Sequence, residues 1–475
     1  MPAPIKFGTS GWRAIIADEF TFPNVRRVSL AIADTLREAG LAGRGVVVGY
    51  DTRFGSERFA EESARALASR GIRCVLSRTP IPTPAVAHAV RHHRFGGAIN
   101  ITASHNPAEY NGLKFSTEQG APAPLAITQE VERRAAQIEE QEGPIPLDAA
   151  AAALIERQGD FLDPYLEQLD GLVRFEAVRK AGLRVGIDPR WGVARGWLDA
   201  ALKRHDVPFE ILHDHRDVTF GGGGPDVSAR NLEELGRMTA ERGLGLGIAC
   251  DGDADRFGVV DADGSWINPN LLLALLADYL AETRGFRLGL GRTYATTGLL
   301  DAVARHHGVA VHQTPVGFKY LGELILQGDK VYLAGEESAG MSMAGHVPEK
   351  DGLLAGLLAA EMVAVTGRTI AGLRDDLFAK VGPLHSARLD FRVTQQQVAR
   401  LRQAMAAPPA ALGARSVARA TVWDGLRLDF EDGSWLLMRP SGTEPVVRYY
   451  VEAPTPEGLE ELQRAGRAAL IGDSA

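Results

Sequence analysis

Cysteine is scarce in this chain of 475 residues, which contains only Cys74 and Cys250. Two cysteines exclude a disulfide framework and a CxxC metal site, so both are predicted to be small buried apolar side chains. Long apolar runs are also missing, because Leu271–Ala277 and Leu353–Ala360 fall far short of the roughly 20 residues that a membrane span needs. The N-terminus lacks the charged start and apolar core of a signal peptide. We therefore expect a cytoplasmic protein with no membrane partner.

An excess of positive charge is absent as well. The formal net charge is −8, and no run rich in lysine or arginine offers a footprint for a phosphate backbone, which argues against a nucleic-acid partner. An anionic ligand would instead need individual cations close to polar loops. Seven cations meet that condition: Arg13, Lys114, Arg256, Lys319, Lys350, Arg439 and Arg448.

The length and the hydrophobic pattern predict several domains, since one core seldom supports this many residues. Short apolar runs alternate with longer amphipathic segments, as in residues 45–50, 57–69 and 72–76, and this alternation predicts βαβ units. Toward the C-terminus, strand-like runs are separated by short turns, which indicates an antiparallel sheet. We predict an α/β protein with three mixed α/β sandwich domains plus a smaller C-terminal α+β domain around one central cleft. The expected domains are residues 1–165, 166–269, 270–383 and 384–475.

Four polar loops follow short apolar runs that predict buried strands. They are TASHNP at 102–107, DGDADR at 251–256, GEESAG at 335–340 and RPSGTEP at 439–445. Open α/β sheets place ligand chemistry at strand ends of this kind. We therefore expect the four loops to line a single cleft.

The second loop predicts a metal site. Asp251, Asp253 and Asp255 alternate with small residues, so a tight turn can gather three carboxylates around one hard cation. An EF-hand is excluded, because Arg256 stands at the sixth position, where glycine is needed, and Ala262 stands at the twelfth, where glutamate is needed. Without a cation the three carboxylates would repel one another. A magnesium ion held here would take its remaining oxygen ligands from water or phosphate.

The other loops offer a nucleophile, a hydroxyl-binding pair and an anion cradle. Ser104 is the candidate nucleophile. Glu336 and Ser338 can exchange hydrogen bonds with sugar hydroxyls, although a capped helix start is an alternative interpretation. The fourth loop combines the Arg439 guanidinium with two hydroxyls and the backbone N–H groups around Gly442, which suits a phosphate dianion, while a plain β-turn is the alternative.

In this order, and over nearly the full length, the four motifs resemble the α-D-phosphohexomutases, the phosphoglucomutase/phosphomannomutase family. The resemblance implies that Ser104 is carried as phosphoserine and that its phosphate completes a Mg²⁺ site with Asp251, Asp253 and Asp255. It also implies that Glu336 and Ser338 bind the sugar. The residues that match the family's phosphate-binding loop are Arg439, Ser441, Gly442 and Thr443, and Arg448 is a further phosphate-binding candidate.

Other segments carry the same resemblance. The signature FGTSGWR at 7–13 makes Arg13 an expected active-site cation, and Lys114 and Lys319 match family lysines near the reacting groups. One position departs from the phosphomannomutase-like pattern GEMSGH, because Met341 follows Gly340 where that pattern has histidine. This departure favours glucose phosphates over mannose phosphates. It also makes His346 and Lys350 candidates for the missing role.

The implied reaction is the interconversion of hexose 1-phosphate and hexose 6-phosphate through a bound hexose 1,6-bisphosphate. Arg256 would neutralise charge, and His105, Lys114 and Lys350 are the candidates for general acid and base. Phosphoglucosamine mutase is the alternative within the family, although that branch typically has glutamine where this chain has Glu337. A phosphatase with an aspartyl nucleophile and a non-catalytic sugar-phosphate sensor are the alternatives outside it. The sequence leaves the oligomeric state undetermined.

Overall fold

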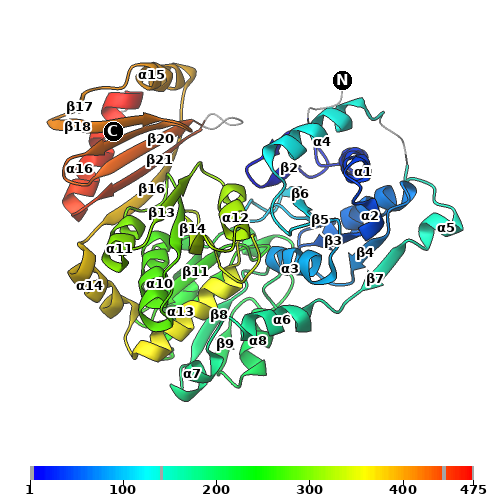
Figure 1. The fold of residues 1–475 in the computed structure, drawn as a ribbon, viewed down its shortest axis with the longest axis horizontal. Helices are drawn as coiled ribbons and strands as arrows, with labels where there is room; N and C mark the ends of the chain where they lie inside the picture. The colour runs from blue at the N-terminus through cyan, green and yellow to red at the C-terminus, as the bar shows by residue number, and fades with distance from the viewer. Residues whose placement is uncertain (1–4, 140–142, 441–445, 473–475) are drawn as a thin grey trace. The chain divides into compact units, whose positions relative to one another are not determined.

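The structure is a computed structural model that describes residues 5–139, 143–440 and 446–472 (Figure 1). The chain divides into two compact units. The first is built from residues up to 269 together with 317–371, and the second from 270–316 together with the residues from 372 onward. The chain therefore leaves the first unit after residue 269 and returns to it at residue 317.

The N-terminal part of the first unit is a mixed sheet of seven strands. Its strands are β1 (Phe7–Gly8), β2 (Gly11–Ile15), β3 (Val46–Tyr50), β4 (Cys74–Ser77), β5 (Gly97–Ile101), β6 (Tyr110–Thr117) and β7 (Ile155–Gln158). They lie in the order β1-β2-β6-β5-β3-β4-β7. Strands β5, β3, β4 and β7 are parallel, whereas β6, β2 and β1 are joined antiparallel.

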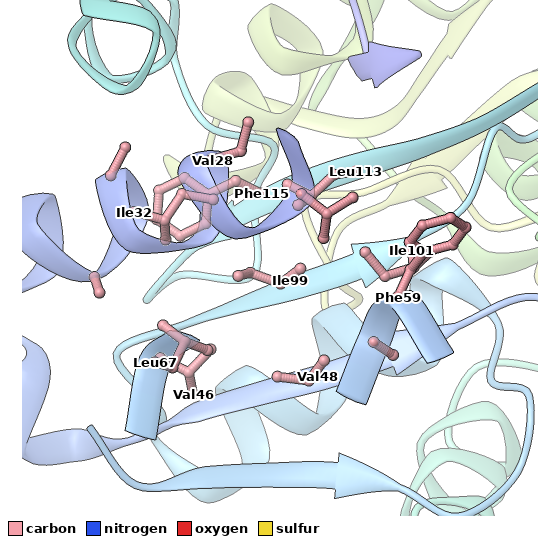
Figure 2. Packing of buried hydrophobic residues seen from close by; sticks show 14 of the residues in the cluster. Val28, Ile32, Val46, Val48, Phe59, Leu67, Ile99, Ile101, Leu113 and Phe115 are labelled. Atoms are coloured by element: carbon pink, nitrogen blue, oxygen red, sulfur yellow. The ribbon is translucent and has the colours of Figure 1, made fainter. Parts of the chain in front are cut away.

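Helices cover both faces of this sheet. They are α1 (Phe22–Glu38), α2 (Ser56–Ser69), α3 (Thr83–His93) and α4 (Leu125–Gln137), and a short α5 (Ala149–Ala152) precedes β7. Val46 and Val48 point into a core shared with α1, α2 and α4, as Figure 2 shows for part of it. On the opposite face Gly49 lies against Val86 of α3. Successive residues of β3 therefore face two separate helix layers, one on each side of the sheet.

A second sheet of four strands follows in the first unit. It contains β8 (Val185–Asp188), β9 (Phe209–Ile211), β10 (Leu246–Cys250) and β11 (Phe257–Asp261), in the order β11-β10-β8-β9. The helices in this stretch are α6 (Leu162–Asp170), α7 (Phe175–Lys180), α8 (Leu198–Arg204) and α9 (Glu233–Glu241). The sheet also packs against α13 (Gly352–Thr366), where Gly356 leaves no room for a Cβ beside Ile248. Helix α12 (Phe318–Leu326) and the hairpin of β14 (Val331–Glu336) and β15 (Gly340–Met343) complete the unit.

The second unit begins with the apolar helix α10 (Pro269–Arg284), the parallel strands β12 (Gly289–Thr293) and β13 (Val311–Thr314), and α11 (Leu299–His307) between them. After α14 (Ile370–Val381), the C-terminal part is a six-stranded antiparallel sheet. Its strands are β16 (His385–Arg392), β17 (Ala411–Leu412), β18 (Arg415–Val422), β19 (Leu426–Phe430), β20 (Trp435–Pro440) and β21 (Val446–Ala453). Helices α15 (Gln395–Ala406) and α16 (Pro456–Gly466) pack on this sheet.

The predicted fold class is confirmed, since parallel and mixed sheets covered by helices precede an antiparallel C-terminal sheet. The apolar runs before the four polar loops are all strands: β5, β10, β14 and β20. Among the described residues no single helix is long and apolar enough to cross a membrane. Only α13 and α14, taken together across the bend between them, have the length and composition of a membrane span. Most of α13 is buried inside the first unit.

A buried carboxylate ties the C-terminal sheet to the segment between β12 and α11 within the second unit. Glu452 on β21 accepts hydrogen bonds from the Thr297 hydroxyl, from the Gly298 N–H at 2.7 Å and from the Trp435 indole N–H at 2.7 Å. Burial raises the pKa of Glu452. The Thr297 and Trp435 donors are buried and the Gly298 N–H is half-buried, so the carboxylate satisfies three groups that have little or no access to water.

We expect Glu452→Ala to lower the free energy of unfolding by about 3 kcal/mol or more, because it leaves two buried donors and one half-buried donor unpaired. Urea unfolding followed by tryptophan fluorescence measures the change. Glu460→Ala on the exposed side of α16 is the control and is expected to change the unfolding free energy by less than about 0.5 kcal/mol. Equal effects of the two substitutions would contradict a structural role for Glu452.

Candidate active site

The candidate nucleophile lies in a tight loop directly after β5. Ser104 has a left-handed backbone with φ 54°, and its N–H donates to the Thr102 hydroxyl at 2.9 Å. A non-glycine residue in such a conformation costs on the order of 1–3 kcal/mol, so surrounding contacts must hold it there. The Ser104 hydroxyl is buried and donates to Asp251 Oδ2 at 2.8 Å. The predicted nucleophile and the predicted metal loop are therefore in direct contact.

The three aspartates of the DGDADR loop form a compact buried cluster. Carboxylate oxygens of Asp251, Asp253 and Asp255 lie within 4.8 Å of one another. Gly252 lets this loop lie against the nucleophile loop, because a Cβ there would come within 2.6 Å of the Ser104 carbonyl oxygen. Asp253 Oδ1 is buried with no hydrogen-bond partner among the described residues. An orphaned oxygen within a buried carboxylate cluster fits a divalent cation, and Mg²⁺ has the preference for oxygen ligands that this donor set offers.

The charges of the cluster are strongly coupled. Burial raises the pKa of Asp251 well above its ordinary value, and the charges of Asp255 and Asp253 add to the effect. Burial also acts to raise the pKa of Asp255, but Lys114 and Lys350 outweigh it and hold that pKa far below its usual range. Like charges around Asp251 and opposite charges around Asp255 thus help to shift the pKa values of these two neighbouring carboxyl groups in opposite directions.

Two lysines from different segments meet the aspartates. Lys114 on β6 donates to Asp253 Oδ2 and to Asp255 Oδ2, each at 2.6 Å. Lys350 Nζ lies 3.2 Å from Asp255 Oδ2 and 3.0 Å from Glu349 Oε1. The structure therefore brings both predicted catalytic lysines to the metal loop.

Lys350 reaches the cluster because the start of α13 packs closely on the metal loop. The Gly352 N–H donates to the Ala254 carbonyl at 3.0 Å. A Cβ at Gly352 would collide with the Arg256 carbonyl oxygen. The position therefore requires glycine.

The predicted arginines and the histidine lie around the nucleophile. Arg13 on β2 donates to Asn106 Oδ1 at 2.7 Å, in the same loop as Ser104. Burial, with Arg256 close by, lowers the pKa of Arg13 to about 10, so the guanidinium stays charged at neutral pH. The Arg256 N–H donates to Asp251 Oδ1 at 3.0 Å. His105 Nδ1 lies 3.5 Å from the Ser104 hydroxyl oxygen.

A polar pocket opens beside this cluster. The FGTSG segment at 7–11 lines it together with Lys114, Lys319 and Glu349. Burial lowers the pKa of Lys319. The first five residues of the N-terminal signature and the two predicted lysines therefore line one cavity.

The GEESAG loop is the tight turn of the β14–β15 hairpin and not the start of a helix. Ala339 supplies the left-handed residue of the turn, with φ 69°. The Ser338 hydroxyl donates to Glu336 Oε1 at 2.7 Å. Burial raises the pKa of Glu336, with Lys350 acting in the opposite direction. The two predicted sugar-binding residues thus form a pair next to one of the lysines at the metal loop.

His346 occupies a different setting from the other candidates. Its side chain has no exposed surface, and its Nε2 lies 2.7 Å from Asp351 Oδ2. The same oxygen accepts a hydrogen bond from the Tyr165 hydroxyl at 2.6 Å, while Asp351 Oδ1 caps α13 at the Leu354 N–H. This geometry favours a positioning role for His346, at the start of α13, over direct contact with a sugar.

The fourth predicted loop is only partly described. Ser441, Gly442 and Thr443 lie outside the described residues, so their phosphate-binding role stays a prediction. Arg439 is the last residue but one of β20 and donates through Nε to the Asp424 carbonyl at 3.0 Å. Arg448 lies opposite Arg439 on the neighbouring strand β21. Arg439 and Arg448 belong to the second unit.

The structure adds residues that the sequence reasoning missed. Thr83, at the first position of α3, donates its hydroxyl to Asp253 Oδ2 at 2.6 Å, and its N–H donates to the Asp253 carbonyl at 3.0 Å. Asn100 on β5 donates to the same hydroxyl at 2.9 Å. Nothing in the sequence around Thr83 indicates this contact. Arg53, which holds the nucleophile loop, could have been found from the sequence, because it closely follows the apolar strand β3, the parallel neighbour of β5.

Comparison with known proteins identifies the family. Models of the four phosphoglucomutase/phosphomannomutase domains match residues 4–142 (α/β/α domain I), 163–264 (domain II), 268–381 (domain III) and 390–469 (C-terminal domain). The chain belongs to the α-D-phosphohexomutase family. The activity of a phosphohexomutase, an isomerase that acts on small sugar phosphates, follows from this membership, and the family uses Mg²⁺.

Relatives within the family carry different substrate names. The chain is 31% identical to a phosphoglucomutase/phosphomannomutase of Thermococcus kodakarensis over 97% of both chains. It is 32% identical to a phosphoglucosamine mutase of Frankia alni over 98% of both. Among solved structures, a Thermus thermophilus protein provisionally described as a phosphomannomutase is 33% identical, with a TM-score of 0.85 over 98% of this chain and 99% of that one. The fold is therefore common to mutases of several sugars.

We expect Thr83→Val to weaken Mg²⁺ binding to this phosphohexomutase by roughly 10- to 100-fold, because it removes a hydroxyl that orients a ligating carboxylate. Titration calorimetry of the purified protein measures the affinity without reference to turnover. Thr83→Ser is expected to restore most of it. Thr239→Val is the control, since the Thr239 hydroxyl is equally buried but bonds only to its own helix at Leu235. Unchanged affinity in Thr83→Val would refute the orienting role.

Proposed function

We propose that this phosphohexomutase interconverts glucose 1-phosphate and glucose 6-phosphate, with phosphorylated Ser104 as the phosphoryl carrier and mannose phosphates as possible further substrates. The observation that carries the proposal is the direct contact between the Ser104 hydroxyl and the buried aspartate cluster. A serine in this position lies beside the cation site that would stabilise charge on a transferring phosphoryl group.

In the first step, a free hydroxyl of the hexose monophosphate attacks the phosphorus of phosphoserine 104. A new P–O bond forms to the sugar oxygen, the P–O bond to the serine oxygen breaks, and the hydroxyl proton passes to a base. The resulting hexose 1,6-bisphosphate then presents its other phosphate to Ser104, and the same bond changes run in reverse. His105, Lys114 and Lys350 are the candidates for receiving and returning the proton.

Charge neutralisation and positioning provide most of the catalysis of phosphoryl transfer. When bound by Asp251, Asp253 and Asp255, Mg²⁺ would supply Lewis-acid stabilisation of the phosphoryl oxygens. The chain's own cations act on the same place: Arg13, Lys114, Arg256 and Lys350. Because hydrogen bonds or ion pairs hold Arg13, Lys114 and Lys350, these three groups need little reorganisation during the reaction.

The bisphosphate must react in two opposite orientations, so the sugar site has to bind hydroxyls that both poses share. The Glu336 and Ser338 pair suits this task, since it offers an acceptor and a hydroxyl on one rigid hairpin. The phosphate that is not reacting would be held by the 439–443 loop together with Arg448. Met341 after Gly340 supports the preference for glucose phosphates over mannose phosphates.

Glucosamine phosphate is the second candidate substrate, because relatives 30–32% identical to this chain are named phosphoglucosamine mutases. Glu337 in the sugar loop argues for the neutral hexose. A phosphorus NMR time course with Mg²⁺ and a trace of glucose 1,6-bisphosphate separates the substrates when glucose, mannose and glucosamine 1-phosphates are supplied one at a time. We expect the fastest conversion to the 6-phosphate with glucose. Faster conversion of glucosamine 1-phosphate would favour the alternative, and release of inorganic phosphate alone would contradict a mutase.

Ser104→Ala is expected to reduce kcat by at least about 10⁴-fold while leaving the melting temperature within a few degrees, because it removes the phosphoryl carrier but little packing. Turnover is measured by the same NMR assay, and the site of modification by mass spectrometry after incubation with glucose 1,6-bisphosphate. Ser77→Ala, on β4 in the same sheet and likewise buried, is the control and should keep both turnover and phosphorylation. Retained activity in Ser104→Ala would rule out this serine as the carrier.

A further inference from the structure

Arg53 is a fully buried arginine that the reaction described above does not use. Its side chain has no exposed surface. Nε donates to Asp51 Oδ2 at 3.1 Å, Nη1 donates to the carbonyls of Pro107 and Tyr110 at 2.7 and 3.0 Å, and Nη2 donates to the carbonyls of Ser104 and Asn106 at 2.6 Å each. A guanidinium has five N–H donors, and every one of them is used here.

Three of the four carbonyls belong to the loop between β5 and β6 that carries Ser104, and the fourth, that of Tyr110, belongs to the first residue of β6. This loop needs external support because Ser104 adopts a left-handed backbone without being glycine. One planar group that binds four carbonyls fixes their positions relative to one another, as separate hydrogen bonds from flexible groups would not. Arg53 thus determines the backbone on which the nucleophilic hydroxyl stands.

The guanidinium is itself held from the opposite side. Asp51 Oδ1 accepts hydrogen bonds from the Arg53 N–H at 3.0 Å and from the Ser56 hydroxyl at 2.8 Å. Asn111, on β6 at the far end of the nucleophile loop, donates to the Ser56 oxygen at 2.9 Å. The chain of contacts therefore runs from the end of β3, through Arg53, to both ends of the loop.

We propose that Arg53 is a positioning residue for the phosphoryl carrier. The proposal rests on the proposed role of Ser104. Arg53 contacts the Ser104 carbonyl and not its hydroxyl, so it acts through the loop backbone. It sets the direction in which the Ser104 Oγ faces Asp251 and the incoming sugar phosphate. Because Glu336 and Ser338 lie elsewhere, loss of Arg53 should affect kcat far more than KM.

A second buried arginine in the same sheet domain provides a matched comparison. Arg27 on α1 donates through Nε and Nη2 to the Ala135 carbonyl at 3.1 and 2.8 Å, and through Nε to the Ile138 carbonyl at 3.1 Å. It is buried and clamps backbone carbonyls, as Arg53 does, but it holds the end of α4 and touches no residue of the site. Arg27 therefore shares the burial and the carbonyl contacts of Arg53, although it binds two carbonyls and the Asn24 side chain where Arg53 binds four carbonyls and Asp51.

The experiment compares Arg53→Lys with Arg27→Lys. A lysine keeps the positive charge but lacks the planar set of N–H donors with which Arg53 binds four carbonyls and Arg27 binds two, so both variants are expected to lose thermal stability. For Arg53→Lys we expect kcat to fall roughly 100-fold with KM within about threefold of the wild type, because a displacement of about 1 Å at a reacting group has an effect of this size. For Arg27→Lys we expect kcat within about twofold of the wild type.

Phosphorylation of Ser104 by glucose 1,6-bisphosphate, followed by intact-mass spectrometry over time, is the second readout. Slower loading, meaning slower phosphorylation of Ser104, in Arg53→Lys than in Arg27→Lys supports the positioning role, provided that both variants are folded at the temperature used. Equal loading and equal kcat in the two variants would overturn it, as would a change confined to KM. Absence of phosphorylation in the wild type would overturn the role of Ser104 and, with it, the role of Arg53.

A milder pair of variants keeps the proposal testable if Arg53→Lys does not fold. Ser56→Ala loosens Asp51 and Asn111 without removing the arginine, and kcat is expected to fall severalfold. Ser63→Ala lies on the same helix, α2, and removes an equally buried hydroxyl that accepts from Ser29 at 3.0 Å, away from the site. It should leave kcat unchanged. An equal kcat in Ser56→Ala and Ser63→Ala would count against the clamp.

Discussion

Repulsion among three buried carboxylates is the constraint on which the first unit depends. Asp251, Asp253 and Asp255 come from one short loop and have almost no exposure, so their charges cannot be screened by water. Two lysines and a cation site offset that charge, and the hydroxyls of Ser104 and Thr83 fix two of the carboxylates. If this negative charge were not compensated, at least one of the carboxylates would have to bind a proton, or the loop would have to move. The charge balance that makes the fold possible is therefore also the charge environment that phosphoryl transfer requires.

The compensating groups arrive from elements that are far apart in the sequence. Lys114 comes from a strand of the first sheet, Thr83 from the start of a helix on the other face of that sheet, and Lys350 from the turn before α13. Lys114 lies within β6, Thr83 is the first residue of α3, and Lys350 directly precedes the N-cap of α13, so none of them lies within a long loop. Such placement holds charged atoms in fixed positions, which serves both stability and catalysis.

Much of this could be predicted from the sequence, and the successes share a cause. The strands before the four loops were predictable because short apolar runs are bounded by polar turns, and the aspartate cluster was predictable because alternating carboxylates in a tight loop point to one ion. The alternative interpretation of GEESAG as a helix start is excluded by the β-hairpin around Ala339.

Contacts that arise only in three dimensions could not be predicted. Thr83 meets Asp253 only after two sheets pack together, and the complete burial of His346 leaves no trace in the sequence pattern. The domain boundaries stay a prediction.

The packing of α13 on β10 has a consequence for the order in which the protein is made. Ile248 of β10 lies against Gly356, so part of the second sheet is covered by a helix that the ribosome synthesises about one hundred residues later. Domains generally fold as their chain emerges, and an uncovered apolar sheet face favours aggregation. A nascent chain that ends before residue 352 exposes that face and, if it ends before residue 350, also lacks Lys350 beside Asp255. The second sheet and its acidic loop therefore reach their final state only after the chain has passed through the second unit and returned.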